Sequence, residues 1–149
     1  DVPPAILVKA DKADQYKTLA DLNGKSVGAQ TATTKLDMVN EMEGVTPVAL
    51  QSVLDLVNEL VYDKVDAILV DGGVAKEYAA SNPDLVIADA SAELGEATPY
   101  CVAVAKGDPK GLLPAINAAI AKMNEANMLE TFIADASKLA DVAVNVTAD

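Results

Sequence analysis

The sequence contains neither histidine nor arginine, and its 149 residues include one cysteine and no tryptophan. Without histidine, the side chain that most often transfers protons in enzymes is missing. A single cysteine cannot form a disulfide within the chain, and no Cys/His set is available for zinc. These absences weigh against acid–base and zinc-dependent catalysis, and neither a cofactor nor a metal is predicted.

Positive charge is also scarce. Lysine contributes all 11 basic residues against 23 acidic ones, which gives a formal net charge of −12. A nucleic-acid-binding protein needs a basic face, so nucleic acid is excluded as a partner, and an anionic membrane surface is disfavoured. We interpret the acidity as a contribution to solubility. Apolar residues make up 51% of the chain, enough for a packed core, and no apolar stretch is long enough to span a bilayer.

Strand and helix patterns alternate along the chain. Caps are expected at Thr34 with Asp37, at Ser52 with Asp55, and at Asp108 followed by Pro109. Strands are predicted at 5–9, 26–30, 47–50, 67–70, 85–88 and 100–105, and helices at 34–42, 53–61, 72–80, from 108 to about 123, and 129–139. The alternation predicts the α/β class, with a mostly parallel five-stranded sheet flanked by helices. Cys101 lies in the last apolar run and is predicted to be a buried structural thiol.

Two strand ends carry suggestive chemistry, because ligands of parallel sheets bind beyond the carboxyl ends of the strands. At the first, residues 30–34 lead into a helix, whose free N–H groups and dipole form an anion site to which threonine hydroxyls can add donors. The alternative is that Thr33 or Thr34 is only a helix N-cap. At the second, Asp71 follows four apolar residues and could meet an ammonium group; the alternative is a turn residue in an Asp-Gly pair. Together the two ends match a zwitterionic amino acid.

Five segments, in this order and spacing, resemble the bacterial polar amino-acid-binding proteins that serve ABC importers: 19–28, 33–34, 65–71, 100–109 and 113–120. The resemblance implies a periplasmic-binding-protein-like clamshell of two lobes, a receptor for a free amino acid rather than an enzyme. It implies a membrane permease as partner and a periplasmic or extracellular location, with or without a lipid anchor in the full-length form.

The resemblance also implies residue roles. Thr34, together with Thr33 and Gln30, would hold the ligand carboxylate, Asp71 would hold its ammonium, and Val70 would touch its side chain. Where the family usually has glycine before the threonines, this chain has Ala32, which would be strained if the position requires a positive φ.

By the same resemblance, residues 9–104 form the second lobe with both hinge strands, and residues 1–8 and 105–149 are remnants of a first lobe that is mostly missing. The apolar stripe of the C-terminal helices would then fold back on this lobe or cause self-association. Two alternatives stay open. One is an enzyme resembling cyclohexadienyl dehydratases, against which the missing histidine and arginine stand. The other is a ligand-sensing domain of a receptor or regulator, although the chain contains no DNA-binding segment or membrane helix.

Overall fold

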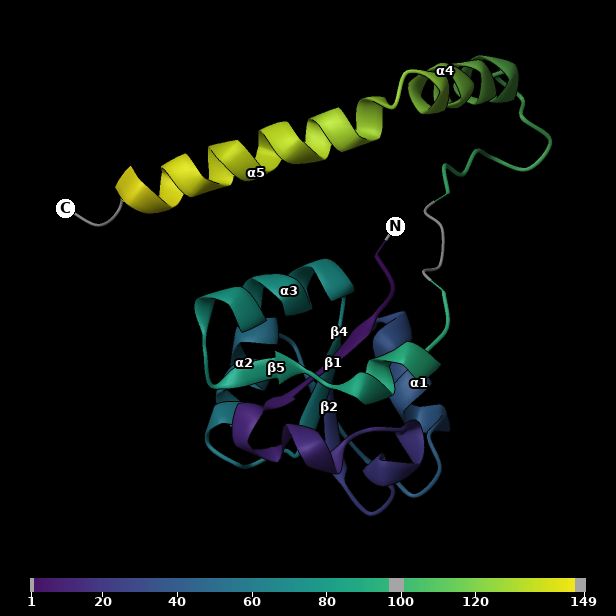
Figure 1. Ribbon diagram of the computed structural model, residues 1–149. Coiled ribbons are helices and arrows are strands. Elements are labelled where there is room, and N and C mark those ends of the chain that lie inside the picture. The colour runs from purple at the N-terminus through teal and green to yellow at the C-terminus, as the bar shows by residue number, and fades with distance from the viewer. Residues whose placement is uncertain (1, 97–100, 147–149) are drawn as a thin grey trace. The chain divides into compact units, whose positions relative to one another are not determined.

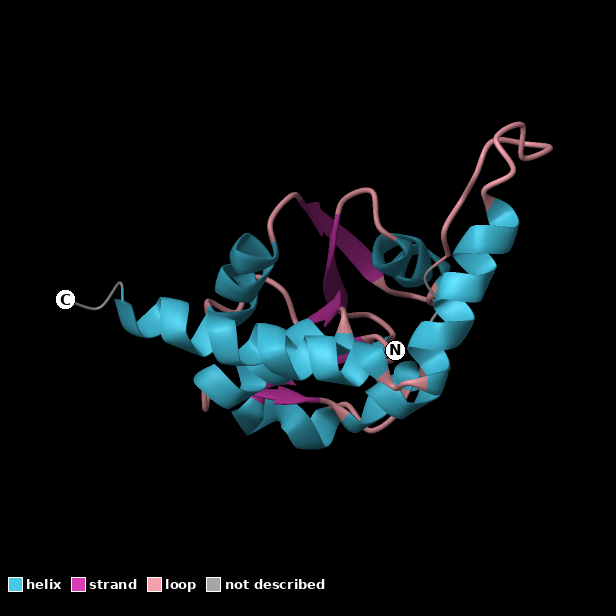
Figure 2. Cartoon of the chain, turned by 90° about the horizontal axis from the view of Figure 1, so that it is seen from above, coloured by secondary structure: helices cyan, strands magenta, loops and turns pink. Residues whose placement is uncertain are grey.

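The computed structural model describes residues 2–96 and 101–146. The chain divides into two compact units, Asp1–Pro99 and Tyr100–Asp149, and each is described by itself. The first unit holds a sheet with helices on both of its faces, and the second holds two helices (Figures 1 and 2).

The sheet of the first unit has the strand order β3-β2-β4-β1-β5. Strand β2 pairs in parallel with β3 and β4, whereas β1 pairs antiparallel with β4 and β5, so four of the five strands share one direction. The strands are β1 (Ala5–Lys9), β2 (Ser26–Gln30), β3 (Thr46–Leu50), β4 (Ala67–Val70) and β5 (Leu85–Ile87). The predicted five-stranded, mostly parallel sheet is confirmed.

Side chains of the central strands point alternately to two apolar layers, as the period of two along a strand requires. From β1, Ile6 and Val8 join one core cluster, while Ala5 and Leu7 join the other. All four residues of β4 are buried, as predicted for a strand covered on both faces. The first layer lies under α1 (Thr34–Glu41) and three short 3₁₀ helices, η1 (Ala10–Gln15), η2 (Leu19–Leu22) and η3 (Asp89–Glu93); the second lies under α2 (Val53–Val61) and α3 (Gly72–Ser81).

The predicted cap at Ser52 is confirmed, because its hydroxyl accepts a hydrogen bond from the N–H of Asp55 at the start of α2. The apolar stripe of this helix then buries Leu56, Val57 and Leu60 against the sheet. Sequence periodicity and a local cap were therefore sufficient to place α2.

A reciprocal pair of residues joins β2 to β4 near their amino ends. The carboxylate of Asp66 accepts hydrogen bonds from the N–H and Oγ of Ser26, both at 2.8 Å, and the N–H of Asp66 donates to Ser26 Oγ at 3.0 Å. Burial, the largest single influence, raises the pKa of Asp66, but the Ser26 hydrogen bonds and the nearby lysines Lys25 and Lys12 together bring this pKa below its ordinary value. The folded state thus favours the charged form of this carboxyl group.

Asp66→Asn is expected to lower the free energy of unfolding at pH 7 by about 1.5 kcal/mol, the lower end of the range for hydrogen bonds to a charged group, because the pair is only partly buried. Since the folded-state pKa is depressed, this stabilisation is present above the unfolded pKa of about 4 and disappears as the pH falls through the folded-state pKa. Urea unfolding between pH 7 and pH 3 measures the difference, with Glu77→Gln at an exposed position of α3 as control. A wild-type–variant difference that stays constant with pH would contradict this role for the charge.

In the second unit, α4 (Leu113–Glu125) and α5 (Met128–Val146) are separated by Ala126 and Asn127, and Asn127 has a φ of +49°. The predicted helix start at Asp108–Pro109 is wrong. Asp108 has a φ of +47°, which a right-handed helix cannot contain, and its carboxylate instead accepts hydrogen bonds from the N–H groups of Leu112 and Leu113. Helix α5 is longer than predicted, since neither glycine nor proline interrupts it.

The predicted strand at 100–105 is also corrected. Tyr100 lies outside the described residues, and residues 101–105 form no strand. A strand requires a neighbouring strand to pair with its backbone N–H and C=O groups. The sheet of the first unit consists of strands β1, β2, β3, β4 and β5, and residues 101–105 pair with none of them. As a result Cys101, predicted to be buried, is exposed.

Candidate functional site

The two strand ends singled out in the sequence lie side by side. Strands β2 and β4 are parallel neighbours, with Ala29 opposite Leu69, so the residues that follow them emerge at the same edge of the sheet. A small cavity of about 20 Å³ lies between these ends, about the space of one water molecule. It is lined by Gln30, Thr33, Lys35, Val53, Leu69, Val70, Asp71 and Val74.

The first turn of α1 is organised by Thr33. Its hydroxyl donates to the carbonyl oxygen of Gln30 at 2.7 Å and accepts from the N–H of Leu36 at 3.3 Å. Thr33 is therefore the N-cap, and the predicted cap at Thr34 with Asp37 is wrong. Thr34 is exposed at the first helical position, where its N–H group has no acceptor within the helix.

The displaced cap has a backbone cause. Ala32 has a φ of +57°, so the position does require the left-handed conformation that glycine adopts most easily. This conformation is unfavourable for alanine by about 1 kcal/mol. It redirects the chain so that Thr33 has extended backbone angles immediately before the helix.

Gln30 is held at the end of β2 by its neighbours. Its side-chain Nε2 donates to the carbonyl oxygen of Gln51 at 2.8 Å. The N–H of the next residue, Thr31, donates to the carbonyl oxygen of Leu50 at 2.8 Å. The amide group of Gln30 has a second N–H, which remains the donor available for a carboxylate.

Asp71 is the N-cap of α3, and the first residue of that helix is Gly72. The alternative of an Asp-Gly turn is therefore wrong. A Cβ atom at Gly72 would lie 2.1 Å from the carbonyl oxygen of Pro3, so the chain entering β1 passes too close for any larger residue. The carboxylate of Asp71 makes no cap hydrogen bond to α3; it forms an ion pair with the ammonium of Lys35.

Lys35, from the first turn of α1, is the functional candidate that sequence reasoning missed. Its side chain is 21% exposed and that of Asp71 is 56% exposed, so the ion pair borders the solvent. A cation in the first turn of a helix is opposed by the helix dipole, and this was the local signal that could have drawn attention to Lys35. Val70, by contrast, is buried in the core beneath the cavity, with 4% of its surface exposed.

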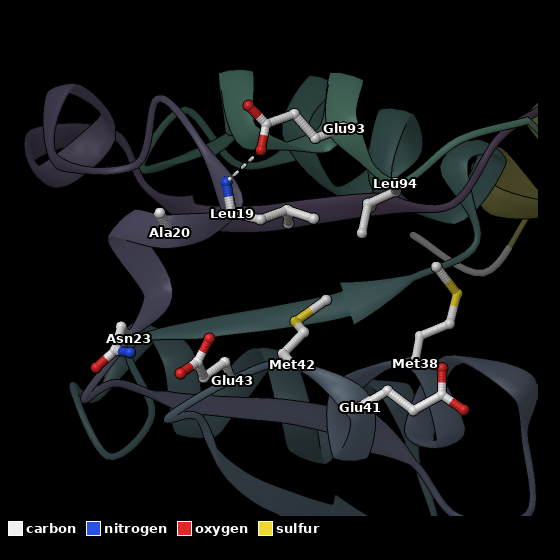
Figure 3. A pocket seen from close by; sticks show the side chains of 9 residues that line it. All are labelled: Leu19, Ala20, Asn23, Met38, Glu41, Met42, Glu43, Glu93 and Leu94. Atoms are coloured by element: carbon white, nitrogen blue, oxygen red, sulfur yellow. Dashed lines mark hydrogen bonds between the residues drawn. The ribbon is translucent and has the colours of Figure 1, made fainter.

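A larger cavity of about 460 Å³ lies elsewhere in the first unit, between η2, η3 and the end of α1 (Figure 3). Apolar side chains of Leu19, Met38, Met42 and Leu94 line it, together with Ala20, Asn23 and three glutamates, Glu41, Glu43 and Glu93. The carboxyl end of α1 adds negative potential, and the lining contains no lysine. This cavity would repel the carboxylate of an amino acid, so the strand-end site is the better candidate.

Among residues 2–96 and 101–146, no group of acidic or cysteine side chains is arranged to hold a metal ion. Within the same residues, no helix combines the length and the apolar character required to cross a bilayer.

The geometry defines a class of protein: an open α/β lobe in which the start of α1 and the carboxylate of Asp71 lie together at one sheet edge. No family model matches the sequence. An arginine-binding protein of an Escherichia coli ABC transporter is 31% identical over 113 residues, which cover 74% of this chain and 46% of that protein. The chain spans less than half the length of the curated relatives it matches.

Solved structures similar to this chain are also amino-acid-binding proteins. An amino-acid ABC transporter substrate-binding protein of Streptococcus pneumoniae, bound to L-arginine, superposes with a TM-score of 0.75 at 31% identity, covering 90% of this chain and 56% of that one. Domain 2 of TmArgBP, the ArgBP of T. maritima, gives a TM-score of 0.54 at 35% identity, covering 57% of this chain and 92% of that domain. The chain belongs to the family of amino-acid-binding proteins of ABC transporters. These relatives are binding proteins rather than enzymes.

Proposed function

We propose that this chain is a large part of the substrate-binding component of an amino-acid ABC importer. It would capture a free amino acid outside the cytoplasmic membrane, in the periplasm or the extracellular space, and deliver it to a membrane permease. Family membership supports this role over a dehydratase or a sensing domain, because the relatives named above belong to transporters.

The observation that carries the proposal is the pairing of Asp71 with an ammonium group at the start of α1. Lys35 provides that ammonium in this structure, which supports Asp71 as the group that meets the ammonium of a ligand. The ligand carboxylate would lie at the start of α1, on the N–H and hydroxyl groups of Thr34, with Gln30 nearby. Thr33 would act mainly through the backbone, since its hydroxyl already serves as the N-cap.

We further propose a basic amino acid as ligand, with arginine as the first candidate, because the E. coli relative is named for arginine and the S. pneumoniae structure contains it. The second lobe would extend to about residue 104, and residues 105–149 would belong to the first. Residues 5–8, which were expected in the first lobe, lie in β1 within the sheet proposed as the second lobe. A calorimetric screen of the twenty amino acids against the full-length protein tests the role, which fails if none of them binds.

Asp71→Asn in the full-length protein is expected to weaken amino-acid binding by about 1.5–3 kcal/mol, the range for a charge-assisted hydrogen bond. Asparagine keeps the shape of the side chain but removes the charge that meets the ammonium. Isothermal titration calorimetry measures the change, and Asp84→Asn is the control for losing one exposed carboxylate elsewhere in the unit. Unchanged affinity for Asp71→Asn would reduce Asp71 to a helix cap.

A further inference from the structure

We propose that Lys35 is a counter-ion built into the ligand site: it pairs with Asp71 while the site is empty and with the ligand carboxylate once a ligand ammonium has displaced it. The inference deepens the proposed function and rests on it. It assigns to Lys35 the discrimination between amino acids and amines that lack a carboxylate.

The position of Lys35 in α1 supports a role in the ligand site. It is the second residue of α1, where the helix dipole disfavours a cation, whereas Asp71 stands at the N-cap of α3 without capping that helix. Asp71 thus makes no capping hydrogen bond to α3, and Lys35 lies where the helix dipole is unfavourable to it, yet the two side chains form an ion pair with each other. Strands β2 and β4, paired at Ala29 and Leu69, hold the two helix starts at the same edge, so the contact is a product of the sheet register.

The balance of charge at the site also supports this role for Lys35. In the empty site, one ammonium and one carboxylate neutralise each other beside the positive ends of two helices. An amine that takes Asp71 would leave two cations, its own and that of Lys35, with a single carboxylate. An amino acid brings its own carboxylate, which restores the balance by meeting both Lys35 and the N–H groups at the start of α1.

The chemistry of lysine suits this exchange. The ammonium carries three donors on a flexible four-carbon stem, so it can leave Asp71 for a nearby carboxylate without moving the backbone. Only 21% of the side chain is exposed, which keeps the ammonium close to the site rather than in bulk solvent. Asp71 is 56% exposed, which leaves it open to an incoming ammonium.

Calorimetry of the full-length protein with L-arginine and L-argininamide tests the proposal, because the amide retains the α-ammonium and lacks the carboxylate charge. Lys35→Met should weaken L-arginine binding roughly tenfold, since a charge-assisted contact to the carboxylate is lost. The same change should leave L-argininamide unchanged or strengthen its binding by up to about fivefold, since a partly exposed competing ion pair is worth little. The preference for L-arginine over its amide therefore falls at least tenfold.

Lys35→Arg should retain most of the preference, because it keeps the positive charge. Lys64→Met is the matched control, since it removes another ion-paired lysine, the partner of Glu59, and should leave both ligands unaffected. Thermal melting of each variant checks folding. The proposal is overturned if wild type binds L-arginine and Lys35→Met either weakens the binding of L-arginine and its amide equally or changes the binding of neither. In either case the proposed function stands. If wild type binds no amino acid, both fall.

Discussion

The chain of 149 residues is expected to bind its amino acid about a thousandfold more weakly than the full-length protein, a difference of about 4 kcal/mol. The proposed strand-end site would contact only one side of a small ligand. Receptors that enclose a ligand between two lobes exclude water and so strengthen every polar contact, and a single lobe lacks that enclosure. A ligand held in the micromolar range by the full-length protein should bind this chain in the millimolar range.

Parallel titrations of both proteins with L-arginine measure this difference. Light scattering belongs in the same experiment, because α4 and α5 expose large apolar side chains, among them Phe132 at 50% and Ile133 at 58%. We expect the isolated chain to self-associate or to rearrange its C-terminal helices. Micromolar binding by a monomeric chain would show that the ligand site is complete within these residues and that the proposed lobe boundary is wrong.

Leu56→Ala is expected to lower the free energy of unfolding by about 3 kcal/mol, because it empties a fully buried position between α2 and the sheet. Gly28 in β2 lies against the side chain of Leu56. A Cβ atom at Gly28 would approach Leu56 Cδ2 to 2.7 Å and Ile68 Cγ2 to 3.1 Å. Gly28→Ala alone should therefore destabilise the protein by about 1 kcal/mol through overpacking. In the Leu56→Ala background the same methyl group fills part of the cavity and should be neutral or stabilising.

Urea unfolding of wild type, both single variants and the double variant completes a double-mutant cycle, with an expected coupling of about 1–2 kcal/mol. Gly73→Ala is the matched control, since a Cβ there meets nothing within 4 Å. Additive effects of Gly28→Ala and Leu56→Ala would contradict the close packing of α2 on β2 and imply that the helix shifts to accommodate either change.

The sequence by itself determined the elements whose stabilising interactions are local. Four consecutive apolar residues at 67–70 are enough to predict a buried strand, and Ser52 with Asp55 is enough to begin α2. Alternating strands and helices then require a largely parallel sheet, and that topology alone brings the ends of β2 and β4 together. The proximity of Gln30, Thr33, Val70 and Asp71 was therefore predictable before any contact was seen.

Only the tertiary structure decided which groups interact at that edge. The left-handed conformation of Ala32 moved the cap from Thr34 to Thr33, and the register of β2 with β4 brought Lys35 to Asp71. The run at 101–105 has the composition of a strand but forms none, because strand pairing depends on a neighbour as well as on propensity. Hydrogen-bond partners and counter-ions distant in sequence decide such positions, and local periodicity does not encode them.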